Sequence, residues 1–390
     1  MGIGRTRKGR GGLALALLLG SLRGLAAQDP PSPSPVRETD LWVSGMEGYH
    51  TYRIPALLAS PRGAVLAFCE GRKRSSSDTG EIHLLLRRSP DGGETWPPPQ
   101  VVAQDGPNVM GNPCPVFDRE TGMLLLLLTR NLGEDSESRI VAGTSKGTRE
   151  VWILRSADEG VTWTKPEEIT RTVKAPDWTW YATGPGIGIQ LRSGRLVIPC
   201  DHAEKGRKAN ASHVIFSDDH GKSWSLGGSL PPVTDECQAV ERADGSVLLN
   251  MRQNAGKGRR AVSVSKDGGE TWGDLTYDPA LVEPVCQGSL LRLTEGARGE
   301  KSRILFSNPA GSRREKLTLR LSYDEGETWP VAKLLHGGPA AYSCLAALPG
   351  GDIACLYEGG ATPYQKLILA RITLEGLTDG RDALRRPGSK

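Results

Sequence analysis

The sequence lacks the cysteine spacing of a zinc site. It has 7 cysteines among 390 residues, and no two of them follow the C-x-x-C spacing of paired zinc ligands. The odd number leaves at least one cysteine unpaired. Most lie in apolar, strand-like segments where free cysteines are commonly buried. The sequence therefore argues against a structural metal centre, and it leaves open which cysteines, if any, form disulfides.

Long helical and membrane-spanning segments are missing as well. No stretch keeps the i, i+3, i+4, i+7 apolar spacing of an amphipathic helix over three or more turns. An apolar stretch at 11–22 has 12 residues, fewer than the ~20 that a membrane span needs. Because it follows basic residues and precedes Ala26 and Ala27, residues 1–27 are typical of a cleaved secretory signal peptide. An uncleaved anchor is the alternative.

The chain has little net charge outside this segment. The formal net charge is +4, and residues 1–27 contain five basic and no acidic side chains, so the remainder carries −1. The basicity therefore belongs mainly to the targeting segment, and a nucleic-acid partner is not indicated. The Pro- and Ser-rich stretch that follows predicts a short linker over 28–39.

What the sequence does contain is an eight-residue pattern, Ser-x-Asp-x-Gly-x-Thr/Ser-Trp, written five times. In each copy the Asp can accept backbone N–H bonds, the Gly can take positive φ, and the Trp can pack on neighbouring strands. Each copy therefore predicts a rigid hairpin tip with a structural role, which locates the fold but not the chemistry. The copies occupy 89–96, 156–163, 217–224, 265–272 and 322–329, and their starts are 67, 61, 48 and 57 residues apart.

Short strands are predicted before and between these copies. The segment before the fifth copy, KLTLRLS (316–322), alternates apolar and polar residues as a half-buried strand does. An all-β chain with a repeat of about 55 residues predicts radially repeated four-stranded sheets, a β-propeller. We expect a six-bladed β-propeller over 40–375 and a polar C-terminal tail over 376–390, since chain ends without apolar pattern are commonly disordered.

A propeller site is built where the blades converge, so its residues are scattered along the sequence. Short motifs with unusual polar residues are the candidates. They are TYRIP at 51–55, a Ser-rich loop with Asp78 at 68–80, a stretch from Asp235 through Glu236 to Arg252, a segment at 306–322, and GPAAYSCLAAL at 338–348.

In this order the motifs resemble those of the exo-α-sialidase (neuraminidase) family, of the bacterial and animal lysosomal-like type. The five repeats look like the family's Asp boxes, and TYRIP looks like its Arg-Ile-Pro motif. The segments ECQ, SNPA, AYS and LYE follow in the family's order along nearly the whole chain after residue 27. The resemblance implies a sialidase-like propeller and a glycoside hydrolase that needs no cofactor and no metal.

The resemblance also implies how the substrate carboxylate is held. The family uses three arginines, and planar guanidinium groups can bind a carboxylate in a bidentate way that Lys cannot. The matching residues are Arg53, Arg252 and Arg314. Arg313 and Arg320 lie near the third, but Arg320 fits better as a strand residue that leads into the fifth box.

Three further positions match supporting residues of the family. Glu358, in LYE, matches the glutamate that orients Arg53. Arg72 matches an arginine near the 4-position of the sugar. Asn112, in GNPCP, falls where the family lines the same pocket, at a point where some members carry Asp.

A sialic acid bears its carboxylate on the anomeric carbon, which would repel a carboxylate nucleophile, and sialidases use Tyr instead. Tyr342 matches this nucleophile, Glu236 the base that takes its proton, and Asp78 the general acid/base. Tyr357 is the alternative nucleophile. We expect the arginines to favour ionised Glu236 and to lower the pKa of Tyr342.

These matches predict a secreted exo-α-sialidase that releases terminal sialic acids from sialylated glycoproteins, glycolipids and oligosaccharides by a retaining mechanism. Extracellular, periplasmic and lysosomal destinations all fit an exported chain without a stable membrane span. The alternatives are a trans-sialidase, a hydrolase of a related nonulosonic acid, and a non-catalytic sialoglycan-binding propeller. Asp201 and His202 stand where some family members carry tyrosines against the sugar's substituents, so the sialic acid variant stays open.

Overall fold

The computed structural model describes residues 1–2, 9, 36–206, 209–296 and 300–385. All of the predicted signal peptide except residues 1–2 and 9, and most of the predicted linker, lie outside the described residues. The chain divides into two units, Met1–Ser34 and Pro35–Lys390, and everything below concerns the second.

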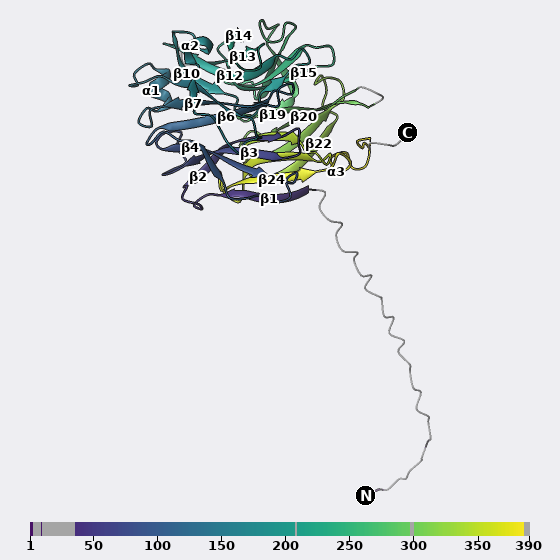
Figure 1. Ribbon diagram of the computed structural model, residues 1–390. Coiled ribbons are helices and arrows are strands. Elements are labelled where there is room, and N and C mark those ends of the chain that lie inside the picture. Colours follow the sequence, from purple (N-terminus) through teal and green to yellow (C-terminus); the bar gives the residue numbers. More distant parts are fainter. Residues whose placement is uncertain (3–8, 10–35, 207–208, 297–299, 386–390) are drawn as a thin grey trace. The chain divides into compact units, whose positions relative to one another are not determined.

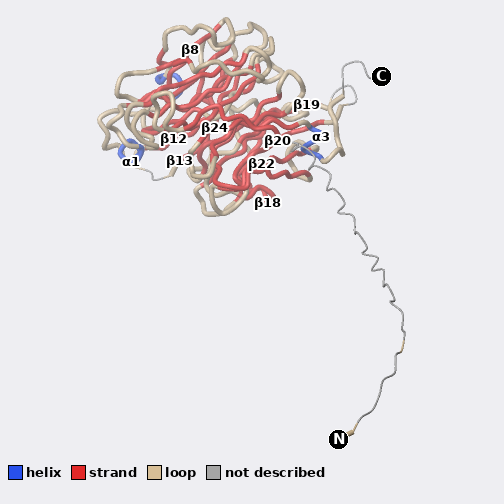
Figure 2. The backbone as a smooth tube through the Cα atoms, turned by 90° about the horizontal axis from the view of Figure 1, so that it is seen from below, coloured by secondary structure: helices blue, strands red, loops and turns tan. Residues whose placement is uncertain are grey.

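The described part of this unit consists mainly of strands, with short helices between them (Figures 1 and 2). Consecutive strands pair antiparallel, as short strands joined by tight turns do. We call each set of strands that pair one after another a run. The first three runs are β2 (Thr51–Ala59), β3 (Val65–Arg72), β4 (Ile82–Ser89) and β5 (Gln100–Ala103); β6 (Val109–Phe117), β7 (Leu124–Asn131), β8 (Glu150–Ser156) and β9 (Glu167–Glu168); β10 (Trp178–Thr183), β12 (Leu196–Glu204), β13 (Asn210–Ser217) and β14 (Ser225–Ser229).

The remaining runs follow the same pattern. The long β22 serves two of them, because its first half pairs with β21 and its second half with β23. The short β11 (Ile189–Gln190) pairs with β12. The strands are β15 (Thr234–Glu241), β16 (Val247–Gln253), β17 (Arg259–Ser265) and β18 (Thr276–Val282); β19 (Ser289–Glu295), β20 (Ser302–Pro309), β21 (Glu315–Ser322) and β22 (Val331–Ala347); then β23 (Ile353–Gly359), β24 (Lys366–Ile372) and β1 (Val36–Val43).

Successive runs pack face to face, which makes the fold propeller-like. Phe68 and Leu84 of the first run share one apolar cluster with Leu126 and Leu154 of the second. The first strands of neighbouring runs also touch, for example β2 with β6 and β22, and β15 with β19. This arrangement confirms the all-β prediction and brings residues that are far apart in the sequence to one place.

Strand β1 joins the two ends of the described unit, and it corrects the predicted boundary. Residues 36–39 were assigned to the linker, but they pair with β24 in register (Figure 1). The Tyr357 hydroxyl donates to Glu38 at 2.6 Å, Lys366 pairs with Asp40 at 2.6 Å, and Trp42 is buried. The polar residues Glu38 and Asp40 of this strand therefore bind partners near the C-terminal end of the chain.

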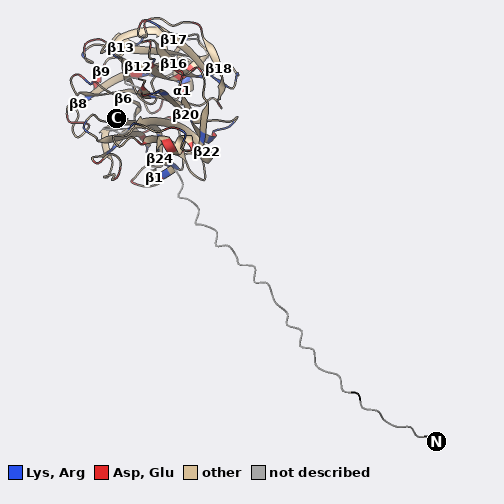
Figure 3. Cartoon of the chain, turned by 90° about the vertical axis from the view of Figure 1, so that its right-hand side faces the viewer, with Lys and Arg blue, Asp and Glu red and all other residues tan. Residues whose placement is uncertain are grey.

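The described part of the predicted C-terminal tail is also ordered by contacts. After the short helices α1 (Glu137–Val141) and α2 (Thr170–Val173), a third, α3 (Leu374–Thr378), buries Leu374 and Leu377. Beyond it, Asp382 accepts two hydrogen bonds at 2.8 Å from the buried guanidinium of Arg303. Acidic and basic residues are interspersed across the described strands (Figure 3), and this pair shows how such charges attach a polar segment to the sheet.

All five repeats fold as the predicted hairpin tip, each directly after β4, β8, β13, β17 or β21. In the fourth, the Ser265 hydroxyl donates to Asp267 at 2.7 Å and accepts from Gly269 N–H at 2.8 Å, while Thr271 N–H donates to Asp267 at 2.9 Å. Gly269 has a φ of +99°. Burial opposes ionisation of Asp267, but hydrogen bonds from the hydroxyl and the backbone N–H of Thr271, and from the Ser265 hydroxyl, lower its pKa to about 2.

All seven cysteines are free and buried, which settles the question of pairing that the sequence left open. No helix in the described part of the chain is long and apolar enough to cross a membrane.

Candidate active site

One pocket of ≈ 170 Å³ gathers the predicted site residues from all around the ring of strands. Strands β2, β6 and β15 each contribute a residue near their start, and β22 contributes Tyr342 near the start of the half that pairs with β23. Eight of the nine predicted residues line the pocket: Arg53, Arg72, Asp78, Asn112, Glu236, Arg252, Arg314 and Tyr342. The ninth, Glu358, is fully buried and hydrogen-bonded to Arg53.

Tyr342 lies between a carboxylate and three arginines. Its hydroxyl donates to Glu236 Oε1 at 2.5 Å. Arg252 Nη1 donates to Glu236 Oε2 at 2.9 Å and to the Tyr342 hydroxyl at 3.2 Å. The guanidinium carbons of Arg53 and Arg314 lie 5.1 Å and 5.6 Å from the centre of the ring. The arrangement suits a phenol that gives its proton to Glu236 while cations stabilise the oxygen.

The prediction that the arginines lower the pKa of Tyr342 and favour ionised Glu236 is wrong, because both pKa values are raised. Burial raises the pKa of Tyr342, the charge of Glu236 raises it further, and Arg252 and Arg53 do not offset these effects. Burial likewise raises the pKa of Glu236, against the charge of Arg252. Removing a charged form from water outweighs the nearby cations here. The hydroxyl therefore keeps its proton, and its hydrogen bond to Glu236 is what prepares the transfer.

Glu358 of β23 fixes both Arg53 and the backbone around Tyr342. Its carboxylate accepts from Arg53 Nε at 3.0 Å and Nη2 at 3.2 Å. The same two oxygens accept from Ile54 N–H at 2.9 Å and from Tyr342 N–H at 3.2 Å. Ile54 has a φ of +60°, an uncommon value for a β-branched residue. One buried carboxylate thus aligns an arginine with the strand that carries Tyr342.

Asp78 lies on the loop between β3 and β4, with 53% of its side chain exposed to the pocket mouth. Its Oδ1 is 2.6 Å from Arg72 Nη2 and 3.7 Å from Arg53 Nη1. Burial opposes ionisation, but the charges of Arg72 and Arg53 hold the pKa of Asp78 below its ordinary value. Arg72 is itself held by Glu70 at 2.6 Å.

The structure also separates the alternatives that the sequence left open. Arg314 donates to the Tyr364 hydroxyl and to the Val285 carbonyl, both at 3.1 Å, and it lines the pocket. Arg320 lies within β21 and Arg313 is outside the pocket lining. Tyr357, which donates to Glu38, is likewise outside it.

Several pocket residues were not predicted. Glu70 stands two residues before Arg72 on β3, so strand periodicity could have placed it on the same face. Arg149 and Glu137 come from a connection and a short helix, where no motif marks them. Burial raises the pKa of Glu137 to about 7. The other unpredicted lining residues include Ile54, Ile82, Val109, Trp180, Ala182, Asn210 and Asp235.

Comparisons with known proteins agree with this geometry. The BNR repeat-like domain family matches residues 63–355. A sialidase from Micromonospora viridifaciens is 37% identical over 85% of this chain and 53% of its own length, and one from Bacteroides fragilis is 33% identical over 81% and 61%. The chain therefore spans little more than half the length of these bacterial relatives.

Other relatives match along most of both chains. An exo-alpha-sialidase from Arthroderma benhamiae is 31% identical over 89% of this chain and 88% of its own, and human Sialidase-3 is 32% identical over 83% and 89%.

Solved structures give the same result. The Hadza microbial sialidase Hz136 superposes with a TM-score of 0.80 and 32% identity over 87% of this chain and 69% of that chain. A leech intramolecular trans-sialidase, at 19% identity and a TM-score of 0.77 over 88% and 71%, shares the fold. Since the identity to the fungal and human proteins extends over most of both chains, this protein belongs to the sialidase family of glycoside hydrolases.

Proposed function

We propose that this protein is an exo-α-sialidase that hydrolyses terminal α-ketosidically linked sialic acids on glycoproteins, glycolipids and oligosaccharides, with retention of configuration. The observation that carries the proposal is the 2.5 Å hydrogen bond from Tyr342 to Glu236, enclosed by Arg252, Arg53 and Arg314.

Substrate binding is assigned to the arginines. Arg53, Arg252 and Arg314 would hold the carboxylate on the anomeric carbon, with Glu358 keeping Arg53 aligned. Arg72 and the first part of β6, which carries Asn112, would line the ring beyond it. The carboxylate then takes up part of the cationic charge that lowers the pKa of Asp78, so its pKa rises when a proton donor is needed.

The first chemical step breaks the bond between the anomeric carbon and the leaving oxygen. Asp78 gives its proton to that oxygen, the Tyr342 oxygen attacks the anomeric carbon, and Glu236 takes the phenol proton. The product is a covalent glycosyl–tyrosine and a free aglycone alcohol. A neutral phenol avoids the repulsion that a carboxylate nucleophile would meet from the substrate carboxylate.

The second step reverses the roles. Asp78, now ionised, takes a proton from water, the water oxygen attacks the anomeric carbon, and the tyrosine oxygen leaves and recovers its proton from Glu236. Two inversions at one carbon give net retention.

We also infer the finer architecture and the destination of the chain. The four-stranded runs are assigned as six blades, the last closed by β1 from the N-terminal side. Residues 1–27 are assigned as an export signal, which places the folded unit outside the cytoplasm.

The test is release of fluorescence from the 4-methylumbelliferyl α-ketoside of N-acetylneuraminic acid. The wild-type protein should turn it over, and Tyr342→Phe should lose at least about 100-fold in kcat, the lower range for a proton-transfer partner alone. Tyr357→Phe is the matched control, because its hydroxyl bonds Glu38 and lies outside the pocket. The first-formed anomer, followed by NMR, should be the α anomer.

Three outcomes would overturn the proposal. A folded wild-type protein without turnover would leave a sialoglycan-binding propeller, to be tested by glycan binding. Loss of activity in Tyr357→Phe but not in Tyr342→Phe would show that Tyr342 is not the nucleophile. Transfer of the sugar to added lactose in preference to water would make the protein a trans-sialidase.

A further inference from the structure

A buried ion pair lies behind two of the three arginines of the site. Arg260 of β17 and Glu283, just after β18, have fully buried side chains, and Arg260 Nη1 is 2.8 Å from Glu283 Oε2. Both residues lie outside the pocket lining, and neither has a role in the proposed catalytic steps. Replacing a buried ion pair by uncharged side chains of similar size is often neutral for stability. Stability alone therefore does not explain this pair.

The carboxylate of the pair holds the end of the strand that carries Arg252. Glu283 Oε1 accepts from Gln253 N–H at 3.0 Å. Gln253 is the last residue of β16 and follows Arg252 directly. Arg252 Nη1 in turn donates to Glu236 Oε2 at 2.9 Å and to the Tyr342 hydroxyl at 3.2 Å. The position of β16 at this end therefore decides where the Arg252 guanidinium meets its two partners.

The guanidinium of the pair holds the backbone that Arg314 binds. Arg260 Nη1 also donates to the Cys286 carbonyl at 2.7 Å. The preceding carbonyl, that of Val285, accepts from Arg314 Nη2 at 3.1 Å. Val285 has a φ of +55°, which a β-branched residue keeps only where surrounding contacts impose it. The hydrogen bond from Arg260 to the next carbonyl is such a contact, and it keeps the Val285 carbonyl directed at Arg314.

Arg260 is itself fixed to β16. Its Nε donates to Asn250 Oδ1 at 2.7 Å, and its Nη2 donates to the Asn250 carbonyl at 3.4 Å. Asn250 lies two residues before Arg252 on the same strand. A planar guanidinium can bind Asn250, Glu283 and Cys286 at once, whereas a single ammonium group cannot.

We propose that Arg260 and Glu283 form a positioning pair that sets where Arg252 and Arg314 stand relative to each other. The inference rests on the proposed function, in which both arginines bind the substrate carboxylate. Arg252 belongs to one run and Arg314 to the next, and the pair ties both to the connection between these runs. Two guanidinium groups can share one carboxylate only if their donors are placed to within a fraction of an ångström.

The test is the double variant Arg260→Met with Glu283→Gln. It removes both charges and keeps an oxygen that can accept from Gln253 N–H, but it leaves the Cys286 carbonyl without its donor. Because no unpaired buried charge remains, the protein should fold. We expect kcat/KM for the 4-methylumbelliferyl α-ketoside of N-acetylneuraminic acid to fall by about 10–100-fold, the effect of a displacement below about 1 Å.

Most of this loss should be in KM, because the carboxylate is bound before the reaction as well as during it. Calorimetry with the unreactive analogue 2,3-didehydro-2-deoxy-N-acetylneuraminic acid measures the same loss without turnover, and its dissociation constant should rise by a similar factor. Arg260→Lys keeps one charge beside Glu283 but cannot also reach Asn250 and Cys286. It should show a smaller rise in both constants, and it decides the matter if the double variant does not fold.

A second buried ion pair provides the matched control. Arg303 and Asp382 have side chains that are 2% and 5% exposed, they share two hydrogen bonds of 2.8 Å, and they lie outside the pocket lining. Arg303→Met with Asp382→Asn removes the same charges, so denaturant unfolding reports any loss of stability that such a change causes. Its kcat/KM and its affinity for the analogue should stay at the wild-type values.

The outcomes separate this inference from the proposed function. Wild-type affinity for the analogue in a folded double variant would overturn the positioning pair, whatever happens to kcat. Losses of equal size in the control would also overturn it, because they would follow from stability alone. No turnover of the ketoside by the wild-type protein would contradict the sialidase assignment, whereas binding of the analogue would still test the pair.

Discussion

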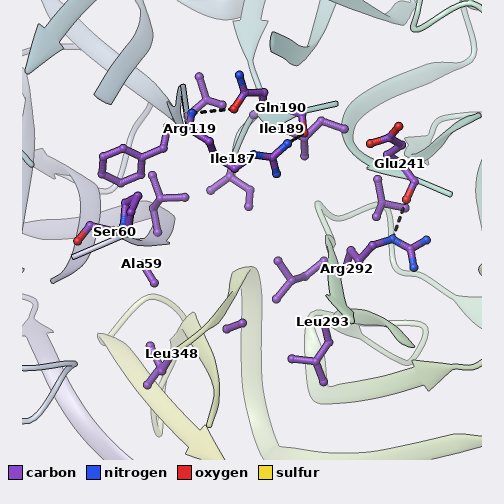
Figure 4. Close-up of a pocket in the computed structure, with 18 of the residues that line it drawn as sticks. Ala59, Ser60, Arg119, Ile187, Ile189, Gln190, Glu241, Arg292, Leu293 and Leu348 are labelled. Atoms are coloured by element: carbon purple, nitrogen blue, oxygen red, sulfur yellow. Dashed lines mark hydrogen bonds between the residues drawn. The ribbon is translucent and has the colours of Figure 1, made fainter. Parts of the chain in front are cut away.

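The same central strands end at two very different pockets. β2, β6, β15 and β22 pass from the candidate active site to a second cavity of ≈ 940 Å³. At the first end they carry Arg53, Asn112, Glu236 and Tyr342. At the other they carry mainly apolar residues, and the cavity is also lined by Ile187, Leu293 and Leu348 (Figure 4).

The contrast shows that volume is a poor guide to function in this fold. The second cavity is more than five times larger, yet two of its arginines are already paired within the protein. The Arg119 guanidinium donates to the Gln190 carbonyl at 3.0 Å. Arg292 Nε donates to the Glu241 carbonyl at 2.7 Å (Figure 4). At the smaller site, charged groups are packed together, and the pKa values of Tyr342, Glu236 and Asp78 are displaced. Perturbed groups in a polar pocket mark chemistry better than size does.

The sharpest test of the polar end is Asp78→Asn with two leaving groups. If Asp78 protonates the leaving oxygen, kcat/KM for 3′-sialyllactose should fall by about 10²–10⁴-fold. The 4-methylumbelliferyl ketoside should lose far less, because its leaving group needs little protonation. Equal losses on both substrates would contradict the assignment and leave Asp78 with a binding role through Arg72 and Arg53.

The all-β fold could be predicted from the sequence, and so could eight of the residues that line the pocket. The boxes are local, since Ser265, Asp267 and Gly269 satisfy one another within one turn. The motif order then placed Tyr342 and Glu236, whose side chains meet across 106 residues.

What failed depends on contacts between distant segments. The segment 36–39 forms a strand because it pairs with β24 and because Glu38 binds Tyr357. The amino-acid sequence of the segment itself does not indicate these partners. Arg149 belongs to the pocket only because Asn112 and Trp180 hold it there. The pKa of Tyr342 was predicted from its charged neighbours, but burial, which no short motif encodes, dominates it.

The apolar end should affect stability and not catalysis. Leu348, 4% exposed, packs in an apolar cluster and lines the large cavity. Leu348→Ala should lower the free energy of unfolding by about 2 kcal/mol, the low end for a buried leucine because one side is already open. Denaturant unfolding measures this, and kcat/KM should stay at the wild-type value. A large loss of kcat/KM in a folded Leu348→Ala protein would mean that the two ends are coupled.

The smallest expected effect concerns the charge beside the base. Asp235, buried in the lining of the site, lies 3.6 Å from Arg252 Nε and accepts from Asn254 at 2.9 Å. Burial raises the pKa of Glu236, and the negative charge of Asp235 adds to this effect. Because Glu236 must be ionised to take the phenol proton, kcat/KM should fall on the acid side through a pKa above the ordinary value of a glutamate.

Asp235→Asn removes that negative charge, so ionised Glu236 becomes less unfavourable and its pKa falls. The acid limb of the kcat/KM profile should therefore move to lower pH, by less than about one unit for a single neighbouring charge. Asp218→Asn is the matched control, since Asp218 pairs with Arg195 near the outer surface, outside the pocket lining. A limb that stays in place, or that moves equally in the control, would show that burial alone sets the pKa of Glu236. The charges at this end of the strands would then serve to hold substrate and not to tune the base.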